Sequence, residues 1–164
     1  MILKPYMKVT SDTTKNMQKA IDSMKGNMTL VGIPQNDNAR QEEGPIGNAG
    51  ILFINEFGSP GQNIPARPVM AIGIKNAQPA LAEEFKKCAQ AALTKGFQAI
   101  DQYYERVGII ASNSIKKVIN DQDGIEGPSE ATLKARESRG FKGTKSLVVT
   151  GQLRNAITYV VRGK

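Results

Sequence analysis

One stripe of apolar residues in the second half of the chain constrains the fold more than any other feature. Its members recur at intervals of three and four residues: Ile100, Tyr104, Val107, Ala111, Ile115 and Val118. This spacing is that of one face of an α-helix. It predicts a long helix from about Phe97 to Asn120. Gly108 lies inside this helix, where we expect a bend or a close helix contact.

The remaining helices and strands are shorter, and they are predicted from the periodicity of apolar residues and from the Gly, Pro and capping residues that bound them. We expect helices over 11–25, 48–57, 79–93 and 128–136, and strands over 28–33, 69–74 and 156–162. For the segment 48–57 a strand is the alternative, because so short an apolar run does not settle the period. In the 69–74 strand, alternate residues would share one face: Met70, Ile72 and Ile74.

Several helix ends are suggested by capping residues. We expect Ser11 or Asp12 to cap the first helix, whose apolar positions are 17, 21 and 24. Asn48 and Gly58 would bound the 48–57 helix, and Pro79 would start the next helix, which Gly96 ends. Near the C-terminus, Thr150 would cap a single helical turn through Asn155.

These elements predict one α+β domain over residues 1–164, with a small, mostly antiparallel sheet and a long helical hairpin packed on one of its faces. Two segments are expected to lie outside this frame. Residues 35–47 are polar, with two glycines and a proline, and predict a flexible loop. Residues 134–145 predict a basic loop around Gly140 and Gly143.

The composition argues against an enzyme. The 164 residues include no His, which excludes Ser-His-Asp triads and His-ligated zinc. The single cysteine, Cys88, excludes an internal disulfide, fits assembly in a reducing cytosol, and is interpreted as a small helix-packing residue. No run approaches the length of a transmembrane helix. We therefore expect no catalysis, no cofactor and no membrane contact.

Other candidate chemistry also fails on spacing. The glycine-rich segment 44–50 lacks the Lys and Ser/Thr of a phosphate-binding loop. Glu42-Glu43 and Glu83-Glu84 are adjacent pairs, and neighbouring side chains on a helix diverge. Asp121 and Asp123 resemble the start of a calcium loop, but the pattern fails after Gly124. We therefore expect no bound metal.

The net charge of +7 is concentrated at the C-terminal end of the chain. Residues 131–164 carry eight Lys and Arg against one acidic residue, Glu137, and the preceding residues balance. Such a bias indicates contact with nucleic acid or an acidic protein face, and a solvated surface is the alternative. The candidate contact residues are Lys134, Arg136, Arg139, Lys142 and Lys145.

A Pro- and Gly-rich loop follows the 48–57 helix. Pro65 and Pro68 restrict the backbone on both sides of Arg67, which suits docking of this side chain against a protein surface or a carboxylate. Glu56 flanks the same loop. It would either pair with Arg67 or be solvated independently of it.

Three segments together resemble the neck and tail-completion proteins of tailed bacteriophages. They are Asn55-Glu56-Phe57-Gly58 followed by Pro65-Ala66-Arg67-Pro68-Val69-Met70, then Ser129-Glu130-Ala131-Thr132-Leu133-Lys134-Ala135-Arg136, then Leu147-Val148-Val149-Thr150-Gly151-Gln152-Leu153-Arg154-Asn155-Ala156-Ile157, which leads into the last strand. Residues 48–162 are covered. The chain departs from the family's usual pattern at Val69, where Phe is frequent, and at Val149, where Asp is frequent.

The resemblance implies a structural virion protein of the phage neck, a head–tail connector or tail-completion subunit. Such subunits form a homo-oligomeric ring between portal and tail, around the DNA path, and are assembled in the host cytoplasm. Their partners would be further copies, portal or connector proteins, tail-terminator or tail-tube proteins, and DNA in the lumen through non-specific contact. The implied assembly contacts are Glu56, Phe57, Pro65, Arg67, Pro68, Thr150, Gly151, Leu153 and Arg154.

Two other functions remain open. The first is a small basic nucleic-acid-binding module that uses the C-terminal region. Phe141 is the only aromatic residue within 134–145, whereas single-strand binders interleave several stacking aromatics with basic residues. The second is an enzyme based on Cys88 or on carboxylates, which the missing partners disfavour. The mass of the purified protein with and without DNA would separate a ring from a DNA-dependent binder.

Overall fold

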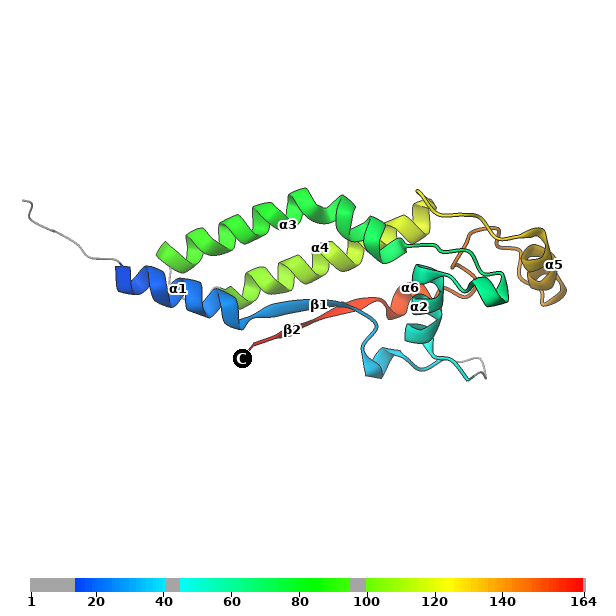
Figure 1. Cartoon of the computed structure of the whole chain (residues 1–164), viewed down its shortest axis with the longest axis horizontal. Coiled ribbons are helices and arrows are strands. Elements are labelled where there is room, and N and C mark those ends of the chain that lie inside the picture. Colours follow the sequence, from blue (N-terminus) through cyan, green and yellow to red (C-terminus); the bar gives the residue numbers. More distant parts are fainter. Residues whose placement is uncertain (1–13, 41–44, 95–99, 164) are drawn as a thin grey trace, which may run out of the picture.

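The computed structural model describes residues 14–40, 45–94 and 100–163. The elements, in chain order, are α1 (Thr14–Gly26), β1 (Met28–Gly32), η1 (Gln35–Asp37), α2 (Asn48–Phe57), η2 (Pro60–Gln62), α3 (Val69–Thr94), α4 (Ile100–Asp121), α5 (Glu130–Ser138), α6 (Gln152–Ala156) and β2 (Thr158–Arg162). Figure 1 shows an elongated molecule in which α3 and α4 run along a two-stranded sheet, with α1 and α5 at opposite ends. The predicted α+β class, with an antiparallel sheet and a helical hairpin, is confirmed.

Helix α4 is the centre of the fold, as its sequence predicts. All six residues of the apolar stripe are buried. Toward one end of α4, Ile115 and Val118 join a core that includes Leu52, Val69 and Ile157. Toward the other end, Ile100 and Tyr104 join a smaller cluster. The helix therefore contributes to both apolar clusters of the described chain.

The sheet pairs the two ends of the described chain. Strands β1 and β2 are antiparallel, with Met28 opposite Arg162 and Gly32 opposite Thr158. Helix α4 packs against both strands. At Gly108 a methyl group would overlap the ring of Tyr159, so the close contact expected at this glycine is made with β2 rather than with a helix.

The structure corrects the prediction for residues 69–93. The segment 69–74 is not a strand but the first part of α3, and Pro79 lies inside that helix rather than at its start. The buried positions Val69, Gly73 and Ala77 are four residues apart, as a helix requires. Figure 1 shows α3 changing direction along its length, and an internal proline is a recognised cause of such a bend.

Helices α3 and α4 approach closely. A methyl group on Gly73 would lie 2.6 Å from Cα of Ile115, and the hydroxyl of Ser114 donates a hydrogen bond of 2.7 Å to the carbonyl of Gly73. Cys88 is fully buried in α3, which confirms its interpretation as a packing residue. The small residues of α3 thus allow the backbones of the two helices to come together.

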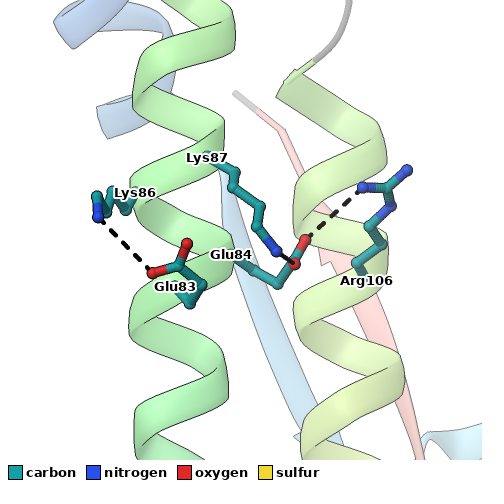
Figure 2. A network of polar contacts seen from close by, with 5 residues as sticks. All are labelled: Glu83, Glu84, Lys86, Lys87 and Arg106. Carbon is teal, nitrogen blue, oxygen red and sulfur yellow. Dashed lines mark hydrogen bonds and ion pairs between the residues drawn. The ribbon is translucent and has the colours of Figure 1, made fainter.

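An ion-pair network joins the same helices at the surface (Figure 2). Lys87 Nζ lies 2.8 Å from Glu84 Oε1, and Nη1 of Arg106, on α4, lies 3.8 Å from Glu84 Oε2. The hydrogen bond from Lys87 lowers the pKa of Glu84, and the charges of Lys87 and Arg106 act in the same direction. Glu83 and Lys86 form a separate, exposed pair at 3.9 Å.

The ends of α2 differ from the expected caps. Its N-cap is Gly47, not Asn48. The capping acceptor comes from a distant residue, because Oδ1 of Asn38 accepts a hydrogen bond from the backbone N–H of Ala49 at 2.8 Å. Asn48 is buried instead, and its amide donates to the carbonyls of Asp37 and Ala39. Part of the 35–47 segment is thereby tied to α2.

Of the predictions for the other helices, some are confirmed and some are wrong. Gly58 lies at the C-cap of α2 with φ 75°, as expected for a glycine position. The short helix α6 has Gly151, with φ 79°, as its N-cap in place of Thr150. In α1, the positions 17 and 21 are exposed and Ala20 is the buried residue. The caps at Ser11 or Asp12, the break at Gly96, the start at Phe97 and residues 41–44 lie outside the described residues.

Candidate assembly surface

The loop between α2 and α3 is rigid because its backbone is bound at several points. Gly58 leaves α2 with a positive φ, and a Cβ there would lie 3.0 Å from backbone atoms of Ile64 and Ala66. Ser59 and Ile64 form a β-bridge, and the backbone N–H of Arg67 donates to the carbonyl of Asn55. These contacts fix the path of the chain into α3.

Glu56 serves this loop in a way that the sequence did not suggest. Its two carboxylate oxygens accept hydrogen bonds from the backbone N–H groups of Met70 and Ala71, each at 2.9 Å. A carboxylate at the N-terminus of a helix satisfies its free N–H groups and interacts favourably with the helix dipole. Glu56 therefore caps α3, so neither of the two alternatives for it, a pair with Arg67 or independent solvation, describes its contacts.

Arg67 binds backbone carbonyls on another segment. Its Nε donates to the carbonyl of Glu126 at 2.8 Å, and its Nη2 donates to that of Gly127 at 3.1 Å. The side chain is half-buried, and it joins the 58–68 loop to the segment that precedes α5. Part of its predicted docking capacity is thus used within the subunit. Pro65 is exposed, and Pro68 accepts the first backbone hydrogen bond of α3, from Ile72.

The C-terminal segment of the resemblance contributes both core and surface. Leu153 is buried in the main core, while Thr150 is exposed. Arg154 donates from Nη1 to Oδ1 of Asn120 at 2.8 Å, which ties α6 to the end of α4. Leu153 and Arg154 therefore contribute to the fold of the subunit, whatever else they contact.

A pocket of about 240 Å³ brings the three segments of the resemblance together. Its lining from these segments includes Asn55, Arg67, Thr132, Thr150, Gly151, Gln152 and Leu153. Arg40 and Arg136 line it as well, and Arg40, Thr132 and Arg136 also line an adjoining recess with Arg139 and Phe141. No sequence periodicity links these positions, and Arg40 was not among the predicted site residues.

Two of the pocket's arginines influence each other. Burial lowers the pKa of Arg136, and the positive charge of Arg67 lowers it further. Neither residue forms an ion pair with a carboxylate in the described part of the chain. The pocket thus holds cations that lack a counter-charge from their own subunit's described residues.

An exposed aromatic pair lies on α2. Phe53 and Phe57 are 64% and 68% exposed, and their ring centroids are 4.8 Å apart. Large apolar side chains that contact each other in solvent are typical of a contact surface. Phe57 was predicted as an assembly contact, whereas Phe53 was missed. Its spacing of four residues from Phe57 on a helix was the available signal.

The basic segment 134–145 is divided between surface and fold. Its first part belongs to α5 rather than to a loop. Lys134, Arg139 and Lys142 are exposed. By contrast, Arg136 donates to the carbonyls of Gly143 and Lys145, and Lys145 donates to that of Asn120 at 2.6 Å.

Searches for other chemistry and for relatives gave no positive result. Among residues 14–40, 45–94 and 100–163, no group of three or more Asp, Glu or Cys side chains is placed to hold a metal ion. No helix in the same ranges has the length and hydrophobicity needed to span a bilayer. Comparison of the chain with protein-family models, curated proteins and solved structures found no match.

Proposed function

We propose that this protein is a structural subunit of the neck of a tailed bacteriophage. Its copies would form a ring between portal and tail, around the DNA path, as a head–tail connector or tail-completion protein. The observation that carries the proposal is the convergence of the three resembling segments on one pocket. Because these segments line one pocket, the residues that carry the resemblance are available together to a single partner.

The construction of this surface supports an assembly role. The loop 58–68 is held by backbone contacts and by the Glu56 cap, so it presents a fixed shape to a neighbour. Preorganised surfaces bind with a smaller loss of conformational entropy. The adjacent rings of Phe53 and Phe57 lie on the helix that leads into this loop and supply apolar area for a subunit contact.

A ring requires two different faces on each subunit, because each copy contacts the next in a head-to-tail manner. Two exposed apolar surfaces are candidates for these faces. The aromatic pair is on α2, and the outer positions Met28, Leu30 and Val160 are exposed on the sheet. We propose that the first face contacts a neighbouring copy and that the sheet contributes to the opposite face.

A nucleic-acid-binding module is the second candidate. It is favoured by the exposed cations Lys134, Arg139 and Lys142 near one end of the molecule. Cations of this kind bind phosphates without sequence preference and with strong dependence on salt. In a ring around DNA the same residues would line the lumen, so the two functions differ mainly in whether the protein self-assembles.

Light scattering on the purified protein tests the proposal. We expect an oligomer of defined mass without DNA at high protein concentration, and annular particles by electron microscopy. The variant Phe57→Ser should shift this oligomer toward the monomer. A protein that stays monomeric at every concentration, and gains mass only when duplex DNA is added, would support the nucleic-acid-binding module instead.

A further inference from the structure

The pocket between α2, α5 and α6 has an unusual balance of groups. Its lining includes Arg67 and Arg136, which have no carboxylate partner among the described residues, and apolar side chains such as Ile51, Leu147 and Val149. Half-buried cations close to one another repel, and the backbone carbonyls that Arg67 and Arg136 bind do not neutralise this repulsion, whereas a nearby anion would. The subunit's described residues do not supply that anion.

Arg136 offers a specific binding edge. A guanidinium has five N–H donors, and the two carbonyls that Arg136 binds, on Gly143 and Lys145, both accept from Nη1. Its Nε and Nη2 have no hydrogen-bond acceptor within the described part of the chain. These two nitrogens form the fork that binds both oxygens of a carboxylate in parallel.

We propose that this pocket binds a carboxylate side chain, with an adjacent apolar side chain, from a segment of a partner protein. The carboxylate would bind the Nε–Nη2 edge of Arg136 within the field of Arg67. The apolar neighbour would cover Ile51, Leu147 and Val149. Two contacts of different kinds, close together, give a site that selects an acidic and apolar peptide.

Charge and shape favour a protein segment over DNA. The pocket has a volume of about 240 Å³ and a partly apolar lining. A duplex presents charged phosphates along a stiff rod and has no apolar side group to bury there. The exposed cations Lys134, Arg139 and Lys142 are better suited to phosphates, because they stand on the surface of α5 and the following loop.

The test uses the full-length protein, labelled with ¹⁵N, and follows backbone and Arg Nε–H resonances by NMR. The probe is the peptide acetyl-Gly-Leu-Glu-Leu-Gly-amide, and the matched control peptide has Gln in place of Glu. We expect the Glu peptide to shift the resonances of Arg136 and its pocket neighbours. The Gln peptide should bind at least about tenfold more weakly, since a charge-assisted pair is lost.

Variants locate the binding site. Arg136→Gln should weaken binding of the Glu peptide about tenfold, while Arg162→Gln, which removes an exposed charge on β2, should leave it unchanged. Arg136→Lys keeps the charge but loses the fork, so it should bind with intermediate affinity. If Arg136→Gln does not fold, the Lys variant still tests the proposal, because undiminished affinity in that variant would contradict a bidentate contact.

Additional titrations test for other occupants of the pocket, and each of the following outcomes would overturn the proposal. Equal binding of the Gln peptide would exclude a carboxylate site. Tighter binding of inorganic phosphate or a twelve-base-pair duplex at the same resonances would assign the pocket to a phosphate. Shifts that follow protein concentration without peptide would make a second copy the occupant. The titration is run at a protein concentration at which light scattering shows a monomer, so the result does not depend on ring formation.

Discussion

The close approach of α3 and α4 gives a prediction with an unusual sign. Replacing a glycine by alanine inside a helix normally stabilises it by about 1 kcal/mol. At Gly73, however, the new Cβ would lie 2.6 Å from Cα of Ile115 and 2.9 Å from its backbone N. Carbon atoms in contact are separated by about 3.5–4.0 Å. The helices would therefore have to move apart by roughly 1 Å, because a backbone cannot rotate out of the way.

The two effects can be weighed against each other. Overpacking of a core costs about 1–3 kcal/mol, and we expect the upper part of that range because backbone atoms of Ile115 are involved. After subtraction of the gain of about 1 kcal/mol in helix propensity, Gly73→Ala should lower the free energy of unfolding by about 2 kcal/mol.

Urea unfolding followed by circular dichroism at 222 nm measures this change. The exposed residue Ala80, on the same helix, provides the matched control. Ala80→Gly should cost about 1 kcal/mol through propensity alone. If Gly73→Ala proves as stable as the native chain, or more stable, the close contact between the two helices at Ile115 is wrong.

Three further changes address the surface and the ion pairs. Phe57→Ser should weaken self-association at least about tenfold, measured by sedimentation, and change the free energy of unfolding by no more than about 0.5 kcal/mol, because the ring is exposed. Because the pKa of Glu84 is lowered in the folded state, its ionised carboxylate stabilises the fold at pH values above the ordinary pKa of 4.5, and this contribution is lost as the pH falls through the lower pKa of the folded state. The free energy of unfolding of Glu84→Gln should therefore depend less steeply on pH in the acid range. An unchanged slope would contradict the pair with Lys87. Joint replacement of Arg139 and Lys142 by Gln should leave stability unchanged and reduce the salt dependence of duplex binding, measured by fluorescence anisotropy, whereas lost stability would assign these side chains to the fold.

The sequence predicted correctly those helices and strands whose buried positions are occupied by large apolar residues. Most of the buried stripe of helix α4 consists of large apolar residues, so its period is plain. In α3 the buried positions include Gly73 and Ala77, which carry little hydrophobic signal. The alternation of Met70, Ile72 and Ile74 then imitated a strand. Close packing of two helices requires small residues at the contact. These residues are only weakly hydrophobic, so the sequence of α3 lacks a clear helical periodicity of apolar residues.

For the candidate assembly surface, the sequence pointed to several residues but not to the groups that they contact. Glu56 and Arg67 were identified from the loop, but both bind backbone groups, which no sequence pattern reveals. The pocket joins Arg67 to Arg136 across segments that only the tertiary fold brings together. Asn38 likewise caps α2 from outside the helix, so local rules pointed to Asn48 instead.

The pairing of β1 with β2 has a consequence for the order of folding. Nearly the whole described chain lies between the two strands, whereas α3 and α4 are neighbours in sequence. Local contacts form early and distant ones late, because a long loop must first be closed. The helical pair should therefore form before the sheet does.

Helix α6 is joined directly to β2, so it reaches its place beside α2 only when the sheet closes. The pocket, which needs residues from α6, is complete only at that late step. Under the proposed function, a chain that is still folding would thus have no finished pocket to offer a partner. Completion of the subunit and formation of the pocket would be the same event, which would keep partly folded copies out of the proposed assembly.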